Sequence, residues 1–86
     1  MKHTKRIKHH PEGHEGLAEN LGDLYYDSLA DFLKILAEKI HQDGEADRKR
    51  GRPRLAAELL ACSDRLQEAA AHIDAAWTIC KPYMDK

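Results

Sequence analysis

Apolar residues alternate at spacings of four and three residues through the second half of the chain, without interruption. They are Leu55, Leu59, Cys62, Leu66, Ala69, Ile73, Ala76 and Cys80. This heptad alternation is typical of a helix that packs along another helix, as in a coiled coil. Pro53 suits the first turn of such a helix, and Pro82 disfavours its continuation. The pattern therefore predicts a helix over about 53–80.

A second helix is predicted over about 17–42, where apolar side chains recur with the helical period of 3.6 residues. Its apolar arc spans roughly 200° of the helix circumference, which is wider than one neighbouring helix covers. Gly44 is a suitable stop signal just beyond it. Residues 43–52 are then expected to form a loop between the two helices.

The chain has 86 residues, which allows one domain with a small core, because short domains bury only about 60% of their unfolded surface. We therefore expect an all-α fold: an antiparallel two-helix hairpin over 15–82 that dimerises into a four-helix bundle. Residues 1–14 are expected to form a flexible, basic, histidine-containing tail, and 83–86 a C-terminal tail. The sequence is compatible with both a parallel and an antiparallel arrangement of the two hairpins in the dimer. The residues expected at the oligomer interface are Leu21, Tyr25, Leu29, Phe32, Leu36, Ile40, Leu59, Leu66, Ile73 and Trp77.

The net charge of −1 conceals a strong segregation of charge. Residues 1–14 and 44–54 each carry a net charge of +3, whereas 15–43 carry −5 and 55–86 carry −2. This distribution predicts that a basic loop faces an acidic partner, and that the chain is a small, non-enzymatic interaction module. The residues expected to bind this partner are Arg48, Lys49, Arg50, Gly51, Arg52 and Arg54.

Within this loop, the sequence Arg50-Gly51-Arg52-Pro53 resembles the core of the AT-hook, a short motif that binds the DNA minor groove. The resemblance covers about six residues including their flanks, and implies contact with A·T-rich DNA. It makes a DNA-associated protein the alternative function. The same residues also suit a simple bend, in which glycine makes the turn and proline starts the next helix.

Few residues suggest catalysis or metal binding. Glu38 and His41 have the E-x-x-H spacing of di-iron bundles, but lie about 160° and 120° from the centre of the apolar face. The tail contains further histidines without a framework that would fix metal geometry: His3, His9, His10 and His14. We therefore expect no cofactor and no metal site, with a metal-binding helical bundle as the second alternative.

The two cysteines, Cys62 and Cys80, lie 18 positions apart in one predicted helix. This spacing separates them by about 27 Å, so they cannot form a disulfide within the helix and are expected to be reduced and buried. No apolar run approaches the roughly 20 residues of a membrane span. We expect a cytoplasmic protein without a membrane partner.

Overall fold

The computed structural model describes residues 3–8 and 13–84. This part of the chain contains three helices and no strand: α1 (Gly13–Gly22), α2 (Tyr26–Lys49) and α3 (Pro53–Met84). The predicted all-α class is confirmed.

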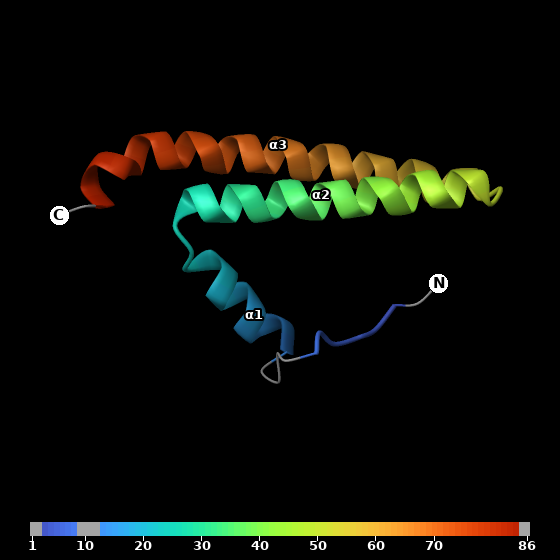
Figure 1. Cartoon of the computed structure of the whole chain (residues 1–86), viewed down its shortest axis with the longest axis horizontal. Coiled ribbons are helices and arrows are strands. Elements are labelled where there is room, and N and C mark those ends of the chain that lie inside the picture. Colours follow the sequence, from blue (N-terminus) through green and yellow to red (C-terminus); the bar gives the residue numbers. More distant parts are fainter. Residues whose placement is uncertain (1–2, 9–12, 85–86) are drawn as a thin grey trace.

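Helices α2 and α3 lie side by side and run in opposite directions (Figure 1). Only Arg50, Gly51 and Arg52 separate them. The molecule measures 53 × 30 × 13 Å, so its smallest dimension is little more than the diameter of one helix with its side chains. The α2–α3 pair is thus a single layer of helices.

Small residues recur every seven positions where the two helices meet. The buried ones are Ala30, Ala37 and Gly44 on α2, and Ala56, Ser63 and Ala70 on α3. Small side chains let helix axes approach closely, and the Ser63 hydroxyl uses this proximity to donate a hydrogen bond of 2.8 Å to the Ala37 carbonyl oxygen. A Cβ atom added at Gly44 would lie 3.0 Å from the Leu60 side chain. Gly44 is therefore a packing position inside α2, where the sequence suggested a stop.

The stripe of α3 that contacts α2 differs from the one that the heptad alternation suggests. Ala56, Ser63 and Ala70 are each displaced by one residue, about 100° around the helix, from Leu55, Cys62 and Ala69. The smaller set faces α2 because it permits the closer approach. The prediction that Cys62 is buried is wrong: Cys62 is exposed and Cys80 is half-buried, and both are free thiols.

The helix predicted over 17–42 is interrupted. It is divided between α1 and α2 at residues 23–25, and the Asp23 and Leu24 amides donate to the Glu19 and Leu21 carbonyl oxygens in the turn that closes α1. Gly22 is the last residue of α1, and glycine is a poor helix former. At its other end α2 continues through Gly44 to Lys49, so 43–49, expected in the loop, are helical.

Both ends of the predicted hairpin domain also shift. α3 continues through Pro82 to Met84, because a proline in the last turn removes only one backbone hydrogen bond. Gly13 and His14 belong to α1. Residues 3–8 lie outside the helices and are exposed.

The core is small. Its buried hydrophobic residues are Ala30, Ala37, Ala56 and Ala70, and among the described residues no large side chain is fully buried. α1 contributes no buried residue and projects away from the α2–α3 pair (Figure 1). The fold thus leaves most of its larger apolar side chains in partial contact with solvent.

Candidate interaction surfaces

The basic segment forms a tight turn. The Arg50, Gly51 and Arg52 amides donate to the carbonyl oxygens of Ala46, Arg48 and Asp47. Gly51 has φ of +78°, in the left-handed region that favours glycine.

Immediately after this turn, Pro53 is the first residue of α3. Arg50-Gly51-Arg52-Pro53 is therefore a helix-to-helix turn, whereas the AT-hook resemblance implies an extended segment. The observed conformation is the bend that the sequence offered as the other interpretation of these four residues.

Asp47 organises the side chains of this turn. Its carboxylate is only 3% exposed, and its Oδ1 lies 3.5 Å from Arg50 Nη1 and 3.3 Å from Arg52 Nη1. A buried carboxylate is costly unless it is paired, so these two guanidinium groups stabilise Asp47 in its buried position. The two arginines of the motif thus hold the turn together.

The other cations of the turn differ in how they are paired. Arg48 forms an ion pair with Glu45, and its hydrogen bond lowers the pKa of the Glu45 carboxyl. Within residues 3–8 and 13–84, Lys49 and Arg54 make no ion pair, and both are exposed. These two side chains are therefore positive charges of the turn that no described carboxylate neutralises in an ion pair.

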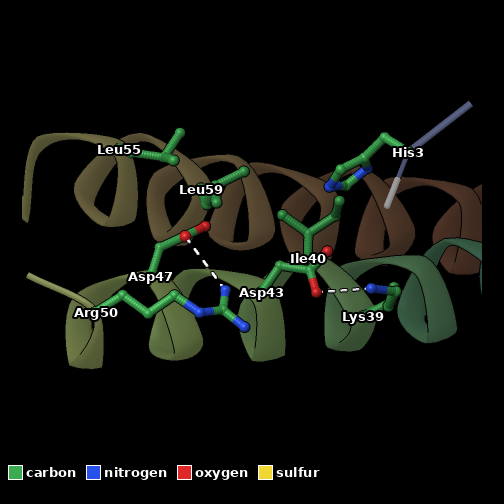
Figure 2. A pocket seen from close by; sticks show the side chains of 8 residues that line it. All are labelled: His3, Lys39, Ile40, Asp43, Asp47, Arg50, Leu55 and Leu59. Carbon is green, nitrogen blue, oxygen red and sulfur yellow. Dashed lines mark hydrogen bonds and ion pairs between the residues drawn. The ribbon is translucent and has the colours of Figure 1, made fainter. Parts of the chain in front are cut away.

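A pocket of about 380 Å³ lies beside the turn (Figure 2). Its lining combines His3, apolar side chains of both helices and two ion pairs. The residues are His3, Lys39, Ile40, Asp43, Asp47, Arg50, Leu55 and Leu59. The Lys39 ammonium and the Asp43 carboxylate lie 2.6 Å apart across one turn of α2. His3, from the N-terminal segment, reaches the pocket next to Ile40 (Figure 2).

An exposed apolar cluster lies at the opposite end, where α2 begins and α3 ends. Tyr25 stacks on Trp77 with a centroid separation of 5.8 Å. Further large apolar side chains near these two chain segments are exposed: Leu24 and Tyr26 beside the start of α2, and Ile79, Tyr83 and Met84 in the last turns of α3. Tyr83 and Met84 were not expected on this surface, because the sequence pattern predicted that the helix ends at Cys80. The apolar and aromatic side chains of 79–84 are the signal that could have identified it.

The ten residues expected at an oligomer interface are all half-buried or exposed. Tyr25 and Phe32 are exposed, Leu21 is half-buried on α1, and the other seven are half-buried on α2 and α3. Whether they contact a second chain stays a prediction.

No cluster of metal-binding side chains occurs in the described residues: no three His, Cys, Asp or Glu gather closely enough to hold an ion. Glu38 and His41 are exposed. His9 and His10 lie outside the described residues.

Gly51 offers a direct test of the turn. Gly51→Ala is expected to destabilise the fold by about 1 kcal/mol, because the backbone stays left-handed where a Cβ is disfavoured. An added Cβ meets no atom within 4 Å, so the effect comes from the backbone alone. Gly51→Asn should cost less, since asparagine tolerates this region. Urea denaturation followed by circular dichroism measures both, with Gly22→Ala as the control: Gly22 also has open space around it but no positive φ. Equal stability of Gly51→Ala and wild type would contradict the left-handed conformation assigned to Gly51.

None of the helices in the described residues is both long and apolar enough to cross a membrane. No protein-family model matches the chain, and comparisons with curated proteins and with solved structures gave no significant match.

Proposed function

We propose that this chain is a small, non-enzymatic helical interaction module whose α2–α3 hairpin dimerises into a four-helix bundle. The observation that carries the proposal is the lack of a core within one copy: the buried hydrophobic residues are four alanines. A single layer of two helices leaves the larger apolar side chains without a second layer to cover them.

The exposed surface supports the same proposal. The chain exposes 6990 Å², whereas a folded monomer of 9.8 kDa exposes about 5,200 Å². The excess of about 1,800 Å² exceeds the roughly 800 Å² that each partner buries in a standard interface. Part of it belongs to α1 and the N-terminal segment, which contain no buried residue.

The basic turn is the surface that we propose for an acidic protein partner. Residues 44–54 carry a net charge of +3, and Lys49 at the end of α2 and Arg54 at the start of α3 flank the three-residue turn. An acidic protein fits this surface better than the minor groove, because the groove requires an extended segment with free arginines, and Arg50 and Arg52 are engaged by Asp47.

Sedimentation equilibrium of the full chain tests the self-association. We expect a mass of twice 9.8 kDa at micromolar concentration. A monomer with fully formed helices at these concentrations would contradict the proposed bundle.

A binding titration tests the acidic partner. Polyglutamate is expected to bind the wild type in low salt and to lose at least about fivefold in affinity in the double variant Lys49→Ser/Arg54→Ser. Lys8→Ser/Lys81→Ser removes the same charge from exposed positions elsewhere and serves as the control. Equal losses in the two variants would contradict a specific role of the turn, as would stronger binding of an A·T-rich duplex than of polyglutamate.

A further inference from the structure

The two faces of the α2–α3 layer differ sharply in polarity. We letter the heptad positions a to g, with the buried small residues, such as Ala37 and Ser63, at a. In an antiparallel pair of helices the e positions of both helices share one face, and the g positions share the other. The contacts agree: Lys34 and Asp74, both at e, lie 2.9 Å apart across the helices, whereas Arg50 and Leu55, both at g, line the same pocket.

The e face is polar except at Leu60, whose half-buried side chain lies against Gly44. Its positions are Asp27, Lys34, His41 and Arg48 on α2, and Leu60, Gln67, Asp74 and Lys81 on α3. The ion pair between Lys34 and Asp74 bridges the two helices and raises the pKa of the Lys34 ammonium. The e face is therefore suited to exposure to solvent.

The g face is apolar over most of its length. Its positions are Leu29, Leu36, Asp43 and Arg50 on α2, and Leu55, Cys62, Ala69, Ala76 and Tyr83 on α3. The adjoining d positions of α3, Leu59, Leu66 and Ile73, are half-buried. Phe32 extends the same surface at its edge and is 37% exposed.

The polarity of the g face also changes along its length. Near the turn it contains the charged part of the pocket, with Lys39, Asp43 and Arg50. Toward the other end it becomes apolar and aromatic, with Leu29, Phe32 and the surroundings of Trp77. The surface that needs covering is thus centred away from the basic turn.

We infer that a second copy of the chain covers the g face, and that the two copies pack antiparallel, with their basic turns at opposite ends of the bundle. This inference rests on the proposed self-association and assigns its face and orientation. The exposed area in excess of that of a typical monomer is about 1,800 Å², which is more than each partner buries in a standard interface. A parallel dimer would place two turns of net charge +3 next to one another, and this repulsion disfavours it.

Two matched substitutions on α3 test the face. Ala69 lies at g and Gln67 at e, both are exposed, and each can be replaced by glutamate without filling a buried site. Ala69→Glu is expected to raise the dimer dissociation constant by about 100-fold or more, because it buries an unpaired carboxylate in the interface. Gln67→Glu should stay within about twofold of wild type. Equal effects of the two variants, or a larger effect of Gln67→Glu, would overturn the assignment of the face.

Distance measurement between spin labels tests the orientation. One label is attached through Lys49→Cys in the full chain that also carries Cys62→Ser and Cys80→Ser. The antiparallel bundle predicts a separation of about 35 Å or more between labels of the two copies, comparable to the length of α2. A parallel bundle would bring them within about 20 Å, since packed helix axes lie about 10 Å apart.

The results separate the two levels of the proposal. A dimer with a short label distance overturns the orientation and leaves the self-association intact. A monomeric mass overturns both the orientation and the self-association. In that case, protection of the variant Ala69→Cys from a thiol-reactive label would show that α1 of the same chain covers the g face.

Discussion

Ala70→Leu is expected to reduce the free energy of unfolding by about 3 kcal/mol. Ala70 has no exposed surface and belongs to the row of small residues at which α3 meets α2. Three additional carbon atoms have no space there, so the helices must separate locally and lose the contacts around Ala30. The gain in apolar area cannot compensate, because the added side chain enters an interface that is already filled. Urea denaturation at fixed protein concentration gives the change.

Ala71→Leu is the matched control for this substitution. Ala71 is the next residue of α3 and is exposed, so the same change in volume there should alter stability by no more than about 0.5 kcal/mol. Similar stabilities of the two variants would show that α2 and α3 do not approach closely along Ala70.

Asp47→Ala is expected to destabilise the chain by about 2 kcal/mol, the range measured for hydrogen bonds to charged groups. Its carboxylate is almost completely buried and is the shared acceptor of Arg50 and Arg52. Removing it leaves two guanidinium groups close together without a counter-charge, and the turn loses the side chain that fixes both. Thermal unfolding and urea denaturation both report the loss.

Asp43→Ala provides the comparison, one helical turn earlier in α2. Asp43 forms an ion pair with Lys39 near the surface, and exposed pairs of this kind contribute only about 0.3–0.5 kcal/mol. The interpretation of Asp47 as the organising residue of the turn would be wrong if Asp43→Ala were as destabilising as Asp47→Ala.

Periodicity predicted the helices better than it predicted their contacts. The heptad row from Leu55 is correctly helical, but the row one residue further on, at Ala56, Ser63 and Ala70, is the one that faces α2. Hydrophobicity alone ranks leucine above alanine for burial. Hydrophobicity does not account for how closely two helix axes can approach, and this interhelical distance determines which of the two rows faces α2.

Helix ends were misassigned because glycine and proline act differently in different surroundings. Gly22 ends α1, whereas Gly44 lies within α2 in contact with Leu60. Pro53 begins α3 as predicted, whereas Pro82 lies within the last turns of the same helix. In each pair the residue type is the same, and only the packing around it distinguishes the two outcomes.

The candidate site was predicted in composition but not in arrangement. The basic charge of 44–54 is evident from the sequence. The role of Asp47 is not, because an aspartate between alanine and arginine looks like an ordinary solvated residue of a charged segment. Asp47 is buried because the chain reverses its direction after Lys49 and the start of α3 packs beside it. This reversal uses the left-handed conformation of Gly51.

The three-residue connection between α2 and α3 also has a kinetic consequence. Closing so short a loop costs little chain entropy, so the contacts nearest Gly51 can form first and each later pair of residues is brought close by the one before it. Topologies dominated by such local steps reach their transition state rapidly. We therefore expect the contacts between α2 and α3 to form first at the arginine-rich turn and last at the aromatic end around Trp77.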